Sequence, residues 1–245
     1  MSILGALTDT YERKARLYPA LVVVAPVIVS AVATQVAKWS ALQAITSIAI
    51  ACGGAFLCAQ LARGEGKRRE PWLFAVWGGK PSVTILRHRD RRLNAATKAR
   101  YHKKLAALVK GTKAPTIEQE AADPVAADQV YEAWSQYLLA NTRNTKTYAL
   151  LFQENINYGY RRNLWGLRRV GIVTTLGCAA VAGFISVRQY RRSGTINEEI
   201  AAACAFSVVL LGLWVFRFTR EWVRIPADAY ADRLIEAVET MGGKR

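Results

Sequence analysis

Residues 87–104 have the sequence RHRDRRLNAATKARYHKK and form the most basic part of this 245-residue chain. They lie within a longer stretch, Arg63 to Arg169, which holds twenty-one Lys or Arg against nine Asp or Glu, in a chain whose total net charge is +16. On both sides of this stretch the chain changes to long uncharged runs. The alternation predicts a membrane part and a separate basic domain rather than one soluble globule.

The uncharged run before the basic stretch predicts the first membrane hairpin. Residues Tyr18 to Val36 carry no charge, and a helix of that length, at about 1.5 Å per residue, spans roughly the hydrocarbon core of a bilayer. Pro26 lies inside this run, which membrane helices tolerate. After Lys38 a second uncharged stretch continues to Leu61, so the chain is expected to turn and cross back.

The uncharged runs after the basic stretch predict a second hairpin. Residues Val170 to Val187 form the third expected span and Ile200 to Phe216 the fourth, which Arg217 closes at the membrane boundary. The fold class is therefore an all-α membrane protein with four transmembrane helices in two hairpins and a helical cytoplasmic domain inserted between them. The expected domains are an N-terminal cytoplasmic segment, hairpin 1, the basic domain, hairpin 2 and a C-terminal cytoplasmic amphipathic helix, at residues 1–17, 18–61, 62–169, 170–216 and 217–245.

Local signals predict the helices of the basic domain. Asn94 is a good N-cap for a helix that ends near Val109, and the Asp123–Pro124 pair is a cap and first-turn signal for a helix that ends near Leu139. Upstream, the aromatic segment 72–77 is expected to be short, since proline and glycine flank it at Pro71, Gly78, Gly79 and Pro81.

Two further helices follow from periodicity. From Thr145 apolar residues repeat with helical spacing, and this helix is expected to continue through an arginine collar into the third span. After Pro226 a short amphipathic helix is expected, with one apolar side formed by Tyr230, Leu234, Ile235, Val238 and Met241.

The charge distribution predicts the orientation in the membrane. With both termini and the basic domain in the cytoplasm, most Lys and Arg residues lie on the cytoplasmic side, as the positive-inside rule requires. Arg188, Arg191 and Arg192 in the second external turn depart from the rule and are partly offset by Glu198 and Glu199. We therefore expect both the N-terminus and the C-terminus inside, and no cleaved signal peptide.

The sequence lacks the common patterns of catalytic and metal sites. Its four cysteines lie in apolar segments without CxxC spacing, so neither a disulfide nor a zinc site is expected. The triplet at 88–90 has the letters of a kinase catalytic loop, but Asn94 comes one residue early and no glycine-rich loop or DFG motif accompanies it. We expect no enzyme activity and no cofactor. The predicted spans hold no ionisable residue, which argues against ion-coupled transport.

The cations of the middle stretch are the candidate binding residues. Three interpretations stay open: contact with anionic lipid head groups, binding of an anionic ligand such as a nucleotide or nucleic acid, and a solvated face that only sets topology. The density of arginines exceeds what topology needs, which favours a ligand. The candidates are Arg87, Arg89, Arg91, Arg92, Lys98, Arg100, Lys103, Lys104, Arg161 and Arg162.

Small and polar residues within the predicted spans form a second candidate set. Such residues line a pore or let helices pack closely, and for any single residue packing is the commoner role. The candidates are Ser40, Gln43, Ser47, Gly54, Thr174 and Thr175.

Three strings carry a resemblance to a known family: WGGKPSVTILRHRD at 77–90, TKARYHKKL at 97–105 and LLFQENINYGYRRNLWGLRR at 150–169. They resemble a family of small four-span bacterial membrane proteins of anti-phage defence, the membrane effector of the Hailong type. The resemblance implies a homo-oligomeric ion channel in the bacterial cytoplasmic membrane that depolarises the cell on activation. It also implies a partner nucleotidyltransferase, whose DNA oligomer holds the channel shut. It assigns a role to no individual residue.

Two functions follow as hypotheses. The first is an oligomeric ion channel or pore-forming effector in which the basic cytoplasmic domain binds an anionic ligand and thereby gates the pore. The alternative is a membrane-tethered scaffold or nucleic-acid-binding protein without channel activity, in which the spans only anchor the chain.

Overall fold

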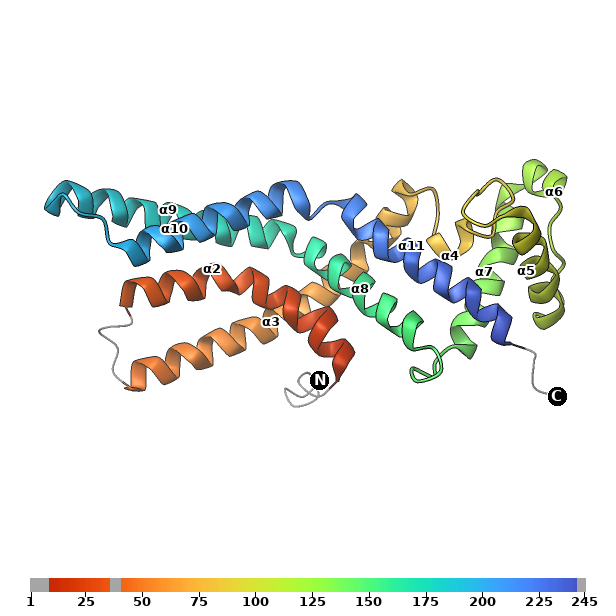
Figure 1. Cartoon of the computed structure of the whole chain (residues 1–245), viewed down its shortest axis with the longest axis horizontal. Coiled ribbons are helices and arrows are strands. Elements are labelled where there is room, and N and C mark those ends of the chain that lie inside the picture. The colour runs from red at the N-terminus through yellow and green to blue at the C-terminus, as the bar shows by residue number, and fades with distance from the viewer. Residues whose placement is uncertain (1–8, 36–40, 242–245) are drawn as a thin grey trace. The chain divides into compact units, whose positions relative to one another are not determined.

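A computed structural model of the chain describes residues 9–35 and 41–241, and every regular element among them is a helix (Figure 1). The elements in chain order are η1 (Glu12–Leu17), α2 (Tyr18–Gln35), α3 (Ala41–Val76), α4 (Pro81–Thr84), α5 (Ala95–Leu108), α6 (Ile117–Ala122), α7 (Pro124–Asn141), α8 (Ala149–Gly166), α9 (Arg168–Ser193), α10 (Glu198–Gly212), η3 (Leu213–Arg217), α11 (Arg220–Glu236) and η4 (Ala237–Thr240).

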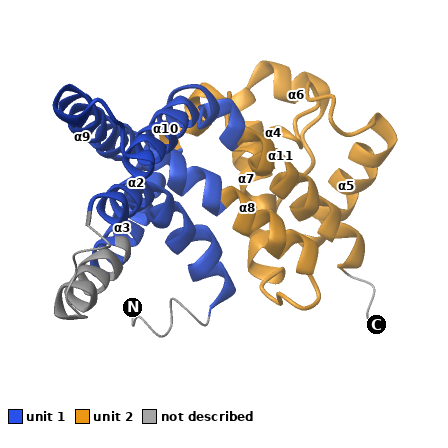
Figure 2. Cartoon of the chain, turned by 60° about the vertical axis from the view of Figure 1, so that its left-hand side comes forward, with its two compact units in different colours: residues 1–70, 159–223 blue, residues 71–158, 224–245 orange. Residues whose placement is uncertain are grey.

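The chain divides into two compact units (Figure 2). Unit 1 consists of residues 1–70 and 159–223, and unit 2 of residues 71–158 and 224–245. Each unit is therefore built from two separate segments of the chain. The sequence sets the C-terminal tail, residues 217–245, apart as its own segment. Its residues 224–245 belong to the same unit as the middle of the chain, and 217–223 belong to unit 1.

Unit 1 contains the apolar helices. Three helical segments are long and apolar enough to cross a membrane, namely Glu12–Thr34, Arg168–Ser193 and Glu198–Arg217. They correspond to the first, third and fourth spans that the sequence predicts. The second predicted span begins among residues 36–40, which lie outside the described part of the chain.

Helices α2, α9 and α10 pack against one another within unit 1. The closest contact lies between α9 and η3, where the indole ring of Trp214 covers Gly171, and a Cβ atom at Gly171 would lie 2.3 Å from the ring. Trp214 is fully buried. Arg168 at the start of α9 donates hydrogen bonds to the backbone oxygens of Trp214 and Val215, at 2.9 and 2.8 Å. These carbonyls lie in the π-helical segment η3, and the arginine satisfies them.

Helix α3 extends further than the sequence suggests. The helix continues through the charged residues after Leu61 and through Pro71 to Val76. Glu65 forms ion pairs with Arg68 and Arg69 one turn later, at 2.9 and 3.3 Å, and such pairs favour continued helix. The helix ends only at Gly78 and Gly79, whose positive φ values of 80° and 138° suit glycine.

Unit 2 has a single hydrophobic core formed by its helices. Trp134, Tyr131 and Leu138 from α7 pack with Leu105 from α5, and all four are fully buried or nearly so. The tail contributes the predicted apolar side of its helix to the same core. Leu234, Ile235, Val238 and Met241 are buried there, and Tyr230 is partly buried. The predicted caps of α5 and α7 are confirmed, because Asn94 accepts from Thr97 N and Asp123 accepts from Ala126 N.

Candidate anion-binding site and helix junction

The loop between α4 and α5 is closed by the ammonium group of Lys98. This residue lies in the second turn of α5 and is only 5% exposed. Its Nζ atom donates hydrogen bonds to the backbone oxygens of Arg87, at 2.6 Å, and of Asp90. The sequence groups Lys98 with the solvent-exposed cations, but the structure uses its charge inside the fold. The reason is that the loop turns its carbonyl oxygens inward, and a buried carbonyl needs a donor.

A buried polar network holds the same loop from the other side. Glu120 of α6 accepts hydrogen bonds from His88 N, at 2.7 Å, and from the hydroxyl of Tyr131, at 2.8 Å. His102 of α5 bonds the oxygen of Leu86 through Nε2, at 2.8 Å. Burial raises the pKa of the Glu120 carboxyl, but these hydrogen bonds outweigh burial, and the pKa is lowered overall. Glu120 is therefore held ionised beneath the loop.

Several predicted binding cations are held by partners within unit 2. Arg87 forms a two-point ion pair with Asp128, at 2.8 and 2.6 Å, and its side chain is 12% exposed. Such a pair fixes a guanidinium in place and leaves it little freedom for a ligand. The other paired cations are Arg92 with Asp90 and Asp228, Arg100 with the Glu239 carboxylate, and Lys104 with the Glu239 backbone oxygen.

Three predicted cations remain available to a ligand. Arg89, Arg91 and Lys103 are exposed, and none of their side chains has a hydrogen-bond or ion-pair partner within residues 9–35 and 41–241. Arg91 lines a cavity of about 440 Å³ beside the start of α5. His88, Asp90, Lys98 and several apolar residues, Ile117 among them, also line this cavity. We call the three exposed cations the free basic patch.

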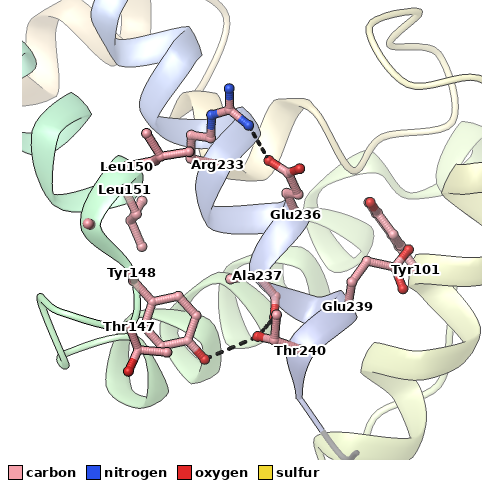
Figure 3. Close-up of a pocket in the computed structure, with 11 residues that line it drawn as sticks. Tyr101, Thr147, Tyr148, Leu150, Leu151, Arg233, Glu236, Ala237, Glu239 and Thr240 are labelled. Carbon is pink, nitrogen blue, oxygen red and sulfur yellow. Dashed lines mark hydrogen bonds and ion pairs between the residues drawn. The ribbon is translucent and has the colours of Figure 1, made fainter.

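A second cavity of unit 2 has the opposite electrostatic character. It has a volume of about 420 Å³ and lies between the start of α8 and the segment α11–η4 (Figure 3). Glu236 forms an ion pair with Arg233, at 2.6 Å, and the hydroxyl groups of Tyr148 and Thr240 are hydrogen-bonded, at 3.2 Å. Figure 3 marks both contacts with dashed lines. Glu239 also lines this cavity, so carboxylates outnumber the guanidinium. An anionic ligand is therefore better matched to the free basic patch.

The remaining two predicted cations, Arg161 and Arg162, belong to unit 1. Arg161 of α8 donates to the backbone oxygen of Trp222, at 2.9 Å, and its guanidinium lies 4.8 Å from the centre of the Trp222 ring. That carbonyl lacks the usual hydrogen bond within the helix, because Pro226, four residues later in α11, has no N–H to donate. Arg161 therefore lets α11 continue through a proline, which explains why the helix begins before Pro226.

Arg162 belongs to a crossing of α3 and α8. It forms an ion pair with Glu70 at 2.8 Å, and both side chains are largely buried. Beside this pair the two backbones touch at a glycine pair, where a Cβ atom on Gly166 would lie 2.7 Å from Gly66 N and 3.0 Å from Gly66 Cα. Asn163 on α8 also donates to the oxygen of Ala15, at 2.8 Å, and so binds η1 to the same place. We call this the glycine crossing.

The glycine crossing lies directly before the third predicted span. The sequence predicts one helix from Thr145 into that span, but Leu167, with φ −82° and ψ 0°, separates α8 from α9. The interruption is a single residue, because Gly171 N again bonds to Leu167 O, at 2.8 Å. The chain therefore carries a short break between a helix fixed at the glycine crossing and a helix of membrane-spanning length.

The predicted pore or packing residues are only partly described. Ser40 lies outside the described residues, as do the side chains of Gln43 and Ser47. At Gly54 a Cβ atom would meet nothing within 4 Å. Thr174 and Thr175 lie on α9: the Thr174 hydroxyl lies 3.0 Å from the oxygen of Val170 in its own helix and 3.5 Å from that of Val23 in α2, and Thr175 is fully buried.

The buried imidazole of His102 predicts a pH dependence of unit 2. Burial lowers its pKa to about 4, against the hydrogen bond to Leu86, while the unfolded chain keeps an ordinary value near 6.5. The unfolded state therefore binds more protons between these pH values, so stability is complete above pH 6.5 and falls as the pH decreases toward 4. We expect a loss of up to about 3 kcal/mol, measured by hydrogen exchange of α5 and α7.

A variant at His102 separates its contribution to the pH dependence from that of other groups. His102→Phe keeps a ring in the same packing position and has no proton to bind, so its stability is expected to be flat over this pH range apart from the general acid response of the chain. If the variant and the natural chain lose stability in parallel, His102 is not the titrating group.

Comparison with known protein families, with curated proteins and with solved structures finds no match for this chain.

Proposed function

We propose that this chain is the subunit of an oligomeric membrane channel or pore-forming effector that is gated by an anionic ligand. In this proposal the chain has four spans in two hairpins and lies in the bacterial cytoplasmic membrane with both termini inside, and the basic domain inserted between the hairpins faces the cytoplasm. The proposal includes a role in anti-phage defence and a partner nucleotidyltransferase, both of which rest on the resemblance of the three sequence strings.

The observation that carries the proposal is the combination of apolar helices with a basic loop whose free cations have no partner within the described chain. Three helices have the length and composition of membrane spans. Lys98 and Glu120 hold the backbone of the loop with Arg89 and Arg91, and the exposed guanidinium groups of these arginines have no partner among the described residues, which leaves them open to a phosphate. A fixed loop binds at a lower cost in conformational entropy than a mobile one.

The helix order supports a route for gating. Helix α8 begins among the residues of unit 2, ends at the glycine crossing in unit 1, and is followed after Leu167 by α9. A displacement of α8 on ligand binding would act on the start of a span, where Arg168 also holds the π-helical segment of the next one.

The ligand part of the proposal predicts a specific loss of affinity. We expect the triple variant Arg89→Ala, Arg91→Ala and Lys103→Ala to bind a fluorescent single-stranded DNA of about ten nucleotides more weakly. The slope of log K against log salt should become shallower by about 2, since each lost phosphate contact contributes about 0.7 for single strands. Fluorescence anisotropy at several salt concentrations measures both quantities.

A matched control carries the same change in charge. Lys110, Lys113 and Arg143 are exposed in the same unit and have no partner in the described ranges. Their triple alanine variant should keep most of the affinity. Equal losses in the two triple variants would mean that only total charge matters, and would remove the free basic patch from the proposal.

The channel part of the proposal is tested by recording ionic current across a bilayer. Purified protein in a planar bilayer should conduct ions, with a conductance that changes when the oligonucleotide is added on the side of the basic domain. Expression without the ligand should depolarise the cytoplasmic membrane. A protein that inserts and stays electrically silent with and without the oligonucleotide would reject the channel.

The alternative function is a membrane-tethered nucleic-acid-binding scaffold. One observation favours it: the hydroxyl groups of Thr174, Ser186 and Ser207 donate to backbone oxygens one turn earlier in their own helices, which satisfies them without water in a pore. A scaffold would bind the oligonucleotide through the same free basic patch without any current.

A further inference from the structure

Helix α9 presents an exposed stripe with a heptad spacing. Every third or fourth residue along one side is exposed: Val173, Gly177, Ala180, Phe184, Val187 and Arg191. The large side chains of the stripe are strongly exposed: Val173 is 70% and Phe184 68% exposed. A Cβ atom on Gly177 would meet nothing within 4 Å, so a hollow lies in the middle of the stripe. We call this stripe the α9 seam.

Helix α10 and its continuation η3 present a second stripe of the same kind. Its members are likewise spaced by three and four residues and exposed: Glu199, Ala202, Phe206, Val209, Leu213 and Phe216. Val209 is 66% and Phe216 81% exposed. The face of α9 opposite its seam is used inside the chain, where Ala182 is buried, and on α10 the buried residues Ala203 and Leu210 border the stripe. We call this stripe the α10 seam.

The two seams match when they are laid antiparallel. Arg191 is paired with Glu199, and each preceding member of the α9 seam is then paired with the next following member of the α10 seam. The small residues then face large ones, since Gly177 meets Leu213 and Ala180 meets Val209. The remaining pairs are Val187 with Ala202, Phe184 with Phe206, and Val173 with Phe216. Alternating large and small residues at heptad spacing are what close antiparallel helix packing requires.

The charges at the end of the seams are complementary as well. Arg191 lies in the last turn of α9 and Glu199 in the first turn of α10. Each sign already suits the dipole of its own helix. Within the described chain, however, neither Arg191 nor Glu199 has an ion-pair or hydrogen-bond partner. Each is therefore open to a partner of opposite charge outside the chain.

Lipid would cover two apolar faces equally well, but it does not explain their fit to each other. Lipid tails gain nothing from the hollow at Gly177 or from its position opposite Leu213. A second copy of the chain uses both features and also supplies the missing charge partners. It has the same orientation in a bilayer, so its α10 runs antiparallel to α9.

We propose that the α9 seam of one copy packs against the α10 seam of a second copy. Because the two seams are different surfaces, the contact is head-to-tail, and repetition of it closes a ring around an axis normal to the membrane. The inference rests on the proposed membrane function in that it places α9 and α10 in the bilayer. It deepens that function by naming the surfaces that join the subunits.

Disulfide trapping tests the register. In a chain whose four cysteines are replaced by alanine, Ala180→Cys together with Val209→Cys should give a ladder of covalent dimers and higher oligomers on mild oxidation in membranes. Each single cysteine should give no ladder. A disulfide that forms only within one chain, or none at all, would overturn the inference.

A matched pair controls for random collision. Val181 and Val208 have nearly the same exposure as one another, at 57% and 56%, but lie on other sides of α9 and α10. The variant Val181→Cys with Val208→Cys should give at least about fivefold less ladder than the seam pair. Equal ladders from both pairs would show diffusional contact and would also overturn the inference.

A charge exchange tests the end of the seams. Arg191→Glu or Glu199→Arg alone should weaken association about fivefold, as expected for a lost surface ion pair that becomes a repulsion. The double variant should restore it, as energy transfer between labelled copies diluted in vesicles would show. If the double variant loses as much association affinity as the two single variants together, the pairing of Arg191 with Glu199 is rejected.

The two proposals fail separately. A disulfide ladder in a protein that carries no current would support the seams and reject the channel. A conducting protein without a ladder would support the channel and reject the seams.

Discussion

Replacing Lys98 by methionine is expected to cost unit 2 about 4 kcal/mol of folding free energy. Methionine keeps most of the length and volume of the side chain but has no ammonium group. The backbone oxygens of Arg87 and Asp90 would then lose the donor that now closes the loop. Because Lys98 is 5% exposed, water cannot easily take its place.

The loss should be visible in the loop before it is visible in the whole chain. Hydrogen exchange of residues 85–93 is expected to accelerate, and denaturant unfolding of the full chain should begin at a lower concentration. Lys103→Met provides the control on the same helix, since Lys103 is exposed and without a partner among the residues described. If the two variants are equally stable, the ammonium group of Lys98 does not hold the loop.

Local signals predicted the helices of unit 2 well. The caps at Asn94 and Asp123 place the starts of α5 and α7 correctly because a cap involves residues at most three positions apart. The apolar side of the tail was also predicted correctly, since helical periodicity shows which residues are to be buried. In both cases the deciding interaction lies within one helix or along one of its faces.

The contacts that define the candidate site could not be predicted in this way. The ion pair of Arg87 with Asp128 joins residues 41 positions apart, and that of Arg92 with Asp228 joins residues 136 apart. In the sequence these arginines look the same as Arg89 and Arg91. Only the fold separates cations that stabilise the loop from cations that remain free, because the difference depends on which carboxylates it brings near.

The helices that join the two units show the same limit. The sequence predicted a second span that ends at Leu61 and a short separate segment at 72–77 bounded by proline and glycine, whereas α3 continues to Val76. It also predicted no break at Leu167. The contact between Gly66 and Gly166 lies close to both features in the chain, and a single helix does not reveal it. Glycine in a helix normally weakens it by about 1 kcal/mol, so two glycines at one contact indicate a close approach of backbones.

Substitution of Gly166 by alanine is therefore expected to destabilise unit 1 by more than about 3 kcal/mol. The added methyl group would lie 2.7 Å from Gly66 N and 3.0 Å from Gly66 Cα. Both are backbone atoms, so no rotation of a side chain relieves the contact. The two helices must separate, which weakens the ion pair of Arg162 with Glu70 and the hydrogen bond from Asn163 to Ala15.

The control is the same substitution two residues before Gly66 on α3. At Gly64 a Cβ atom would meet nothing within 4 Å, so Gly64→Ala should be neutral or stabilise the helix by up to about 1 kcal/mol. Thermal unfolding of the two variants in detergent, followed by tryptophan fluorescence, compares them directly. Equal melting temperatures would mean that α3 and α8 do not cross in backbone contact. A lower melting temperature for Gly166→Ala alone would support the glycine crossing as the fixed point before the span that begins at Arg168.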